Sequence, residues 1–202
     1  MAINSDHKRK KGYTIVEVIL VISLVGLLMP AIFSILYVII QQQLKIYEIT
    51  EVKRQGDYIM QVMKEKVMRD AEILQRDDDG VQGGVAVISN ICTTPGSNYS
   101  SATQGLDFVF QDALLNRFQY VLSGNAIIFR HVGASSIDAA LNNSAVSITN
   151  LRITCSLKSD LTAPIVTIAY TATYNRPVPN PQLGTTVLNY QTKVKLRLGS
   201  NN

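Results

Sequence analysis

Residues 8–40 read KRKKGYTIVEVILVISLVGLLMPAIFSILYVII, and this stretch decides how the rest of the chain is organised. Basic residues and a glycine precede an apolar run of 28 residues, 13–40, in which Glu17 is the only ionisable group apart from tyrosines. As a helix, at about 1.5 Å per residue, this run would be roughly 42 Å long, enough to cross a hydrocarbon core of about 30 Å. It is too long for the apolar core of an ordinary cleaved signal peptide, about 7–15 residues. The preceding basic residues predict that residues 1–12 stay in the cytoplasm and that the remainder faces outward.

The composition is that of a folded protein whose basic charge is concentrated at one end. The chain has 202 residues, of which 47% are hydrophobic and 17% charged. The formal net charge is +4, but without residues 1–12 only 15 basic residues face 14 acidic ones. The basic character of the whole chain therefore does not by itself indicate nucleic-acid binding.

Beyond residue 40 the pattern stays helical and becomes amphipathic. Apolar or small residues recur at steps of three or four, which predicts a helix with one buried stripe over residues 41–79 and an end near Arg76. Within the preceding apolar run, Pro30 and nearby Gly26 are expected to kink or locally melt the helix. The stripe consists of Val52, Gly56, Ile59, Met63, Val67, Ala71 and Leu74.

Residues 80–202 form a predicted β-rich head. Tyrosine, threonine and β-branched residues become frequent, and several segments alternate apolar and polar residues, as antiparallel strands with one covered face do. The amphipathic helix is the natural cover for that face, so the predicted fold class is α+β, a long N-terminal helix packed on a C-terminal antiparallel sheet. The predicted strands are 85–91, 118–122, 126–131, 147–154, 165–174 and 186–198, with a hairpin turn at Ser123-Gly124-Asn125.

The segment KKGYTIVEV and the apolar run after it resemble the prepilin signal of type IV pilins and type II secretion pseudopilins. In that family, basic residues precede a glycine at the cut, an aromatic residue follows, and then Thr-Leu-x-Glu. Gly12, Tyr13, Thr14 and Glu17 match this pattern, with tyrosine in place of the usual phenylalanine and Ile15 in place of leucine. The resemblance implies a type IV pilin-like fold.

Within the head, the segments LDFVF, FQYVLSGNAIIFR and VSITNLRIT resemble the layout of the larger J-type minor pseudopilins. One departure concerns the helix-breaking proline. Many major pilins place it four residues later than Pro30, where this chain has Ser34. The J-type layout and the size of the head, about 120 residues, favour a minor pilin or minor pseudopilin over a major pilin.

The resemblance implies that a prepilin peptidase cuts after Gly12 and N-methylates Tyr13. The chain would then be a structural subunit of a type IV pilus-like filament and not an enzyme. The implied partners are the prepilin peptidase, other pilin or pseudopilin subunits, the inner-membrane assembly platform and, before assembly, membrane lipid. The chain would span the cytoplasmic membrane once, with its N-terminus inside, and then join an extracytoplasmic filament. The expected parts are a cleaved leader (1–12), a transmembrane and polymerisation helix (13–40), its amphipathic continuation (41–79) and the head (80–202).

Glu17 is the residue that such a filament would use for assembly. A lone carboxylate in hydrocarbon costs several kcal/mol, so it is expected to find a partner, and the α-amine of Tyr13 in a neighbouring subunit would supply one. Because both ions must be desolvated, the pair is expected to fix the register of packed helices more than to stabilise them. The alternative is a carboxylate that snorkels to the membrane interface at the start of a plain anchor helix.

Cys92 and Cys155 are the only cysteines. In an outward-facing head they can form one disulfide that closes a loop of about 64 residues and stabilises the fold by ~4 kcal/mol on the chain-entropy model. The alternative is two buried thiols.

No catalytic, cofactor or metal site is expected from the sequence. It contains no Gly-x-Ser-x-Gly, P-loop or Cys-x-x-Cys motif, and His131 is the only histidine outside the leader. Lys193, Lys195 and Arg197 share the polar face of the last predicted strand, where they either contact DNA phosphates or form a solvated, edge-protecting face. The alternative function for the whole chain is a single-pass membrane protein that does not polymerise and whose head binds a ligand or DNA.

Overall fold

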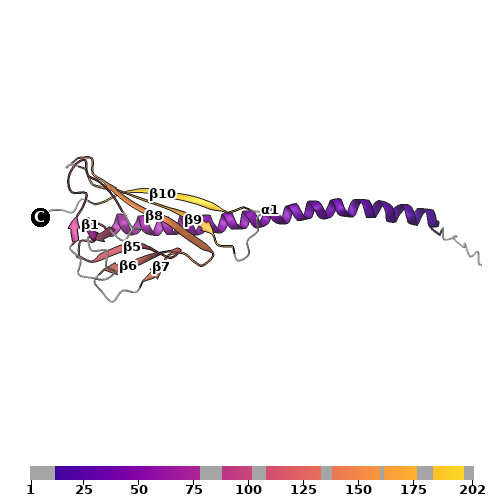
Figure 1. The fold of residues 1–202 in the computed structure, drawn as a ribbon, viewed down its shortest axis with the longest axis horizontal. Coiled ribbons are helices and arrows are strands. Elements are labelled where there is room, and N and C mark those ends of the chain that lie inside the picture. The colour runs from indigo at the N-terminus through magenta and orange to yellow at the C-terminus, as the bar shows by residue number, and fades with distance from the viewer. Residues whose placement is uncertain are drawn as a thin grey trace, which may run out of the picture. The chain divides into compact units, whose positions relative to one another are not determined.

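The chain is an α+β protein, as the sequence predicts. A computed structural model describes residues 12–77, 88–101, 108–132, 138–159, 162–176 and 184–197. One long helix, α1 (Ile15–Asp70), is followed by antiparallel strands (Figure 1). The chain divides into two units, residues 1–44 and 45–202, and α1 contributes to both. Apart from Gly12, the predicted leader lies outside the described residues.

Helix α1 ends earlier than predicted. The expected end near Arg76 and the expected boundary at residue 79 are wrong, because α1 stops at Asp70 and strand β1 (Ile73–Asp77) follows. Glu72 N–H donates to the Gln111 carbonyl at 2.9 Å, and β1 then pairs with a strand on each side. Ladder hydrogen bonds to residues far along the chain therefore outweigh the local preference for helix.

Strand β1 belongs to a six-stranded antiparallel sheet with the order β2-β1-β4-β5-β6-β7. The predicted hairpin is confirmed here as β5 and β6, although Ser123 pairs with Ala126, so that Gly124 and Asn125 alone form the turn. The predicted strand 85–91 lies only partly within the described residues, where β2 occupies its end. The strands of this sheet besides β1 are β2 (Ile88–Asn90), β4 (Phe108–Gln111), β5 (Arg117–Ser123), β6 (Ala126–Val132) and β7 (Ala139–Ala140).

A second antiparallel sheet has four strands in the order β10-β9-β8-β3. The three long strands confirm the alternating segments of the sequence, although the head has two sheets where one was expected. Strand β8 carries an irregularity between Thr149 and Arg152, where Asn150 has a φ of 55°. The strands are β3 (Asn98–Ser100), β8 (Val146–Ser156), β9 (Ile165–Tyr174) and β10 (Val187–Lys195).

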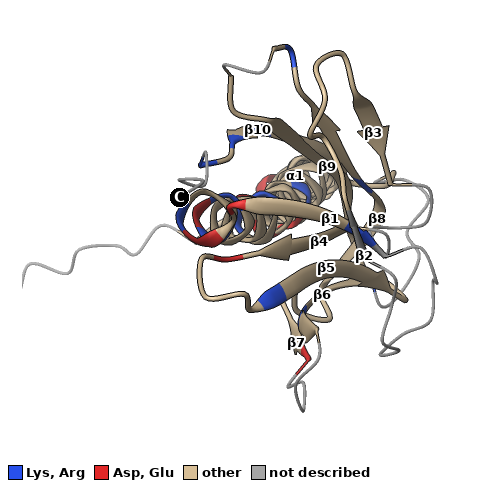
Figure 2. Cartoon of the chain, turned by 90° about the vertical axis from the view of Figure 1, so that its left-hand side faces the viewer, with Lys and Arg blue, Asp and Glu red and all other residues tan. Residues whose placement is uncertain are grey.

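The part of α1 within the second unit, residues 45–70, lies between the two sheets, and we call it the head segment of α1. Figure 2 shows it nearly end on, with β9 and β10 on one side and β4 and β5 on the other. The predicted apolar stripe is buried along this segment and continues into Ala71 and Leu74. The head therefore has one core, formed by the stripe and the inner faces of both sheets.

Gly56 allows the closest approach between the head segment and the four-stranded sheet. Tyr170 and Tyr190 stack with their ring centroids 5.3 Å apart, and the Tyr170 hydroxyl donates to the Gly56 carbonyl at 2.6 Å. The Tyr190 hydroxyl is within 3.4 Å of the Val52 carbonyl and 3.3 Å of the Lys53 carbonyl. A Cβ placed on Gly56 would overlap the Tyr190 ring. The absence of a side chain at Gly56 is thus what lets the two tyrosines reach the helix backbone.

A buried ion pair fixes the start of the head segment. Glu48 is 5% exposed, and Arg176 donates to its two carboxylate oxygens at 2.8 and 2.7 Å. The Thr186 hydroxyl donates to the same carboxylate at 3.1 Å. These hydrogen bonds, from Arg176 above all, hold the pKa of Glu48 below its usual value. The carboxylate is therefore satisfied although it lies on the buried side of the helix.

Replacing Gly56 with alanine is expected to destabilise the head. Alanine favours helix by about 1 kcal/mol, but overpacking a core costs about 1–3 kcal/mol, and the added methyl group would displace the Tyr190 ring. We expect Gly56→Ala to lower the Tm of the full chain in detergent by about 2–6 °C, measured by circular dichroism. Lys64→Ala, at an exposed position of the same helix, is the matched control and should change stability by less than about 0.5 kcal/mol. An unchanged or raised Tm for Gly56→Ala would contradict this account.

Candidate functional site: the N-terminal turn of helix α1

Thr14 caps the N-terminus of α1, directly after Gly12 and Tyr13. The Thr14 hydroxyl accepts a hydrogen bond from Glu17 N–H at 3.3 Å, and its carbonyl accepts one from Val18 N–H at 3.2 Å. The sequence Thr-x-x-Glu is the signature of a capping box, in which glutamate is the third helical residue. The sequence interpretation does not assign the capping role to Thr14, although the four-residue signature predicts it.

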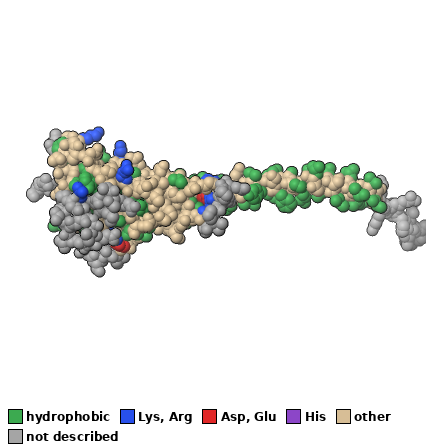
Figure 3. Space-filling view, in the orientation of Figure 1, with side chains coloured by type: hydrophobic (Ala, Val, Ile, Leu, Met, Phe, Trp, Pro, Cys, Tyr) green, Lys and Arg blue, Asp and Glu red, His purple; other side chains and the backbone are tan. Residues whose placement is uncertain are grey.

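The apolar segment of α1, residues 15–40, is exposed throughout. Every side chain from Gly12 to Ile40 is exposed, and Ile15 and Leu27 reach 79% and 77%. Figure 3 shows hydrophobic side chains along the visible face of this part of the helix. The segment is long and apolar enough to cross a membrane. Since water is a poor solvent for such a surface, lipid or other apolar helices are its natural surroundings.

Glu17 is the one carboxylate on the apolar segment. Its side chain is exposed, and it forms no hydrogen bond or ion pair with any residue that the structure describes. It lies in the first turn, where the positive end of the helix dipole favours an anion. Among the sequence-predicted residues, Gly12 and Tyr13 directly precede the capped first turn, and Glu17 lies within it with its carboxylate open to a partner from outside the chain.

The expected loss of helix at Gly26 and Pro30 is not observed. The backbone is helical through both residues. In an α-helix the N–H of residue 30 would donate to the carbonyl of residue 26, so proline removes the donor for the Gly26 carbonyl and for that group alone. A single missing hydrogen bond is compatible with a continuous helix. A kink at this point stays a prediction.

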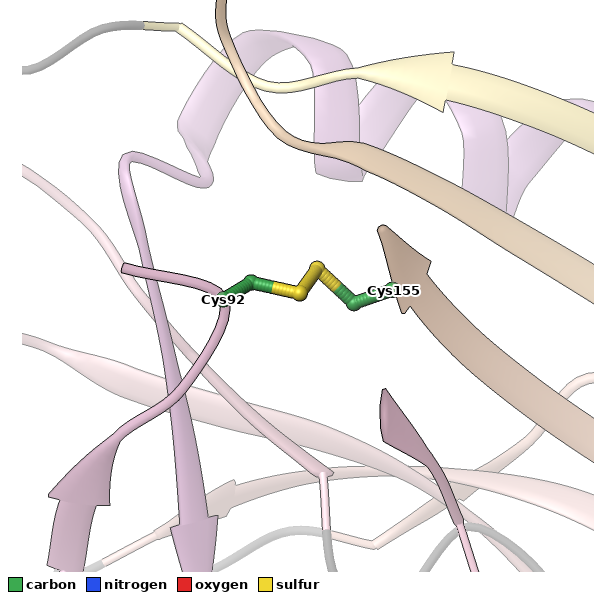
Figure 4. Close-up of a disulfide and its surroundings, with 2 residues drawn as sticks. All are labelled: Cys92 and Cys155. Atoms are coloured by element: carbon green, nitrogen blue, oxygen red, sulfur yellow. A yellow bond between two sulfur atoms is a disulfide. The ribbon is translucent and has the colours of Figure 1, made fainter. Parts of the chain in front are cut away.

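Cys92 and Cys155 form a disulfide, the pair considered from the sequence (Figure 4). Cys92 follows β2 of the six-stranded sheet and has a φ of 58°, whereas Cys155 lies in β8 of the four-stranded sheet. Their Cα atoms are 6.3 Å apart. The bond therefore links the two sheets of the head directly, in addition to their shared contact with the head segment of α1.

The other residues singled out from the sequence are not part of the N-terminal turn. Lys193 and Lys195 are exposed on the edge strand β10, and Arg197 follows the strand, also exposed. His131 is exposed and contacts the Phe129 ring edge-on at 4.9 Å. Among the residues that can be described, no group of three or more histidine, cysteine or acidic side chains is placed to hold a metal ion.

Comparison with protein-family models, with curated proteins and with solved structures finds no match for this chain. The class that the structure itself defines is an α+β protein with an exposed apolar helix able to span a membrane. The features that bear on function are therefore the residues of the N-terminal turn, the apolar segment and the head.

Loss of the disulfide is expected to destabilise the head without preventing membrane insertion. Its cysteines are 63 positions apart, and a loop of this size corresponds to about 2–5 kcal/mol. We expect the Cys92→Ser/Cys155→Ser variant to have a Tm lower by about 4–15 °C in detergent. Wild-type protein treated with reductant is the control and should match the double variant. Equal stability of reduced and oxidised protein would contradict the expectation.

Proposed function

We propose that this chain is a structural subunit, a minor pilin or minor pseudopilin, of a type IV pilus-like filament. The observation that carries the proposal is a lone carboxylate, Glu17, which has no partner among the described residues and lies in the first turn of the exposed apolar segment of α1, a helix that begins three residues after Gly12. A plain membrane anchor has no need for this charge. A helix that must pack in one register against copies or relatives of itself does.

Processing after Gly12 would supply the missing partner. The cut creates an α-amine on Tyr13, a cation four residues before the carboxylate. When subunits assemble, the amine of one helix can pair with Glu17 of the next, in surroundings where neither charge is hydrated. A shifted register would leave both charges unpaired and buried. The pair therefore supports specificity of assembly, even where desolvation offsets much of its Coulomb energy.

Two further features are consistent with this role. The apolar segment of α1 can reside in lipid before assembly and against other helices afterwards, because both environments are apolar. The disulfide of the head fits an oxidising, extracytoplasmic compartment. The proposed role is structural and not catalytic, and the peptidase, sister subunits and assembly platform named above are its proposed partners.

The mature N-terminus is the most direct test of processing. We expect mass spectrometry of the protein from its native membrane to find N-methyl-Tyr13 as the first residue. Gly12→Val should block the cut, because the peptidase site would have to accommodate a branched side chain in place of none, and the protein should retain its leader. An unprocessed wild-type chain, or a first residue other than Tyr13, would refute the pilin proposal.

Replacing Glu17 should separate membrane insertion from assembly. We expect Glu17→Ala and Glu17→Gln to be inserted and cleaved normally but to fall at least about tenfold in sheared filaments, equivalent to losing about 1.4 kcal/mol per subunit contact. Ser23→Ala, at another polar position of the apolar segment, is the control and should assemble normally. Quantitative immunoblots of membrane and filament fractions give the readout. Normal incorporation of the Glu17 variants would remove the pairing role.

The same measurements distinguish the alternative, a single-pass membrane protein that never polymerises. That protein would remain in the membrane fraction with or without Glu17. If its head bound DNA, retention on DNA would fall with rising salt and with neutralisation of Lys193, Lys195 and Arg197. These three side chains are exposed, but so are those of many solvated edge strands, so they carry no proposal of DNA binding by themselves.

A further inference from the structure

The turn between β4 and β5 presents two leucines to solvent. Leu114 and Leu115 are 80% and 72% exposed. Leu115 has a φ of 66°, a left-handed conformation that glycine or asparagine usually adopts in such a turn. A bulky apolar residue is therefore held in an unfavourable backbone conformation with its side chain in water, an outlier of the kind that marks functional surfaces. We call Leu114 and Leu115 the leucine knob.

The knob is held rigidly by its flanking residues. The Asp112 carboxylate accepts hydrogen bonds from Leu114 N–H at 2.9 Å, from Asn116 N–H at 2.8 Å and from the Asn116 side-chain amide at 3.0 Å. These hydrogen bonds, from the Asn116 side chain above all, hold the pKa of Asp112 below its usual value, so the carboxylate stays ionised. Asp112 N–H also donates to the Asn116 carbonyl at 3.0 Å. The knob is thus preorganised, and little conformational freedom is left to lose on binding.

An apolar groove of about 270 Å³ lies between the head segment of α1 and the edge of the six-stranded sheet. Tyr120 and Phe129 contribute aromatic rings to it, and the two-residue strand β7 closes one side. The Tyr120 hydroxyl is buried and has no hydrogen-bond partner within the described part of the chain. A buried hydroxyl without a partner is costly, so a bound acceptor would relieve it. The lining residues are Val62, Glu65, Lys66, Arg69, Tyr120, Phe129, Ala139 and Leu141.

The groove and the knob belong to one region of the head. Arg69 lines the groove. Three residues later, Glu72 N–H donates to the carbonyl of Gln111 at 2.9 Å, and Gln111 directly precedes the turn that carries the knob. Asp112 is close enough to Asp70 for the two charges to interact. A surface that carries both a protrusion and a recess side by side is suited to pairing with a second copy of itself.

We propose that the groove receives the leucine knob of a second copy of this chain. A dry cavity of about 150 Å³ is enough to hold a benzene ring, so the groove has room for leucine side chains. A backbone carbonyl of the turn would be an acceptor of the kind that the Tyr120 hydroxyl lacks.

Charges of both signs flank each of the two surfaces. The knob is flanked by an anion, Asp112, and a cation, Arg117, whose buried Nε has no partner among the described residues. The helix edge of the groove carries Glu65 and, one turn later, Arg69, with Lys66 between them. In the proposed contact Asp112 of one copy would approach Arg69 and Lys66 of the other, and Arg117 would approach Glu65. Asp70 already pairs with Arg69 and Lys66, so the contribution of these charges is to orientation more than to affinity.

Cross-linking between copies tests this contact in the full-length chain, because no free cysteine is present among the described residues to interfere. One tagged copy carries Leu115→Cys and a second, differently tagged copy carries Ala139→Cys, both in the same membrane. We expect mild oxidation to yield a mixed disulfide at least about fivefold above that of a control pair, Leu115→Cys with Ser123→Cys, an exposed position at the other end of β5. Cross-linking no higher than the control would overturn the proposal.

A second variant keeps the test decisive if a cysteine disturbs the fold. Leu115→Gly removes the side chain and also relieves the left-handed backbone, so the Tm should not fall. Self-association of the full chain in detergent, measured by sedimentation, should weaken at least about fivefold. Unchanged association would overturn the proposal, as would a photo-cross-linker at Ala139 that captures a different protein and no second copy. The contact needs no cut after Gly12, so its failure and that of the proposed function are told apart.

Discussion

The contact of Tyr170 and Tyr190 with the helix backbone at Gly56 is the constraint on which the rest of the head depends. Only one position of the helix lacks a side chain at this point, so the rings can approach in one register alone. The Glu48–Arg176 pair, two turns earlier, requires the same register. With the helix fixed on the four-stranded sheet, its opposite side is left to the six-stranded sheet, and the disulfide then links the two sheets.

The elements that the sequence predicts correctly are those with a long, regular period. The stripe of the head segment and the alternation in β8, β9 and β10 each extend over nine or more residues, so local periodicity is sufficient to identify them. The prediction of helix for residues 71–77 is wrong for a physical reason. Leu74 fits the apolar stripe of a helix as well as the buried face of a strand. Pairing with β4, more than 30 residues further along the chain, selects the strand. The shorter strands β3 and β7 depend on partners in the same way.

The functional candidates likewise differ in whether local sequence reveals them. Gly12, Tyr13 and Glu17 are singled out by their resemblance to the prepilin signal, because that pattern is contiguous in the sequence. The leucine knob cannot be predicted from the sequence, since leucine is unusual at a left-handed turn position. Only the backbone conformation reveals that Leu115 occupies one. The groove that Tyr120 lines is assembled from a helix and several strands, so nothing in the linear sequence indicates it.

Because α1 is continuous from Ile15 to Asp70, the helix that carries the apolar segment is also the central element of the head's core. A force that reaches the head through α1 would therefore act on the element at the centre of its core and not on a single edge strand. The stacked tyrosines, the Glu48–Arg176 pair and the buried stripe would have to yield together. Resistance to such a force would be set by how fast these contacts break and not by the overall free energy of unfolding.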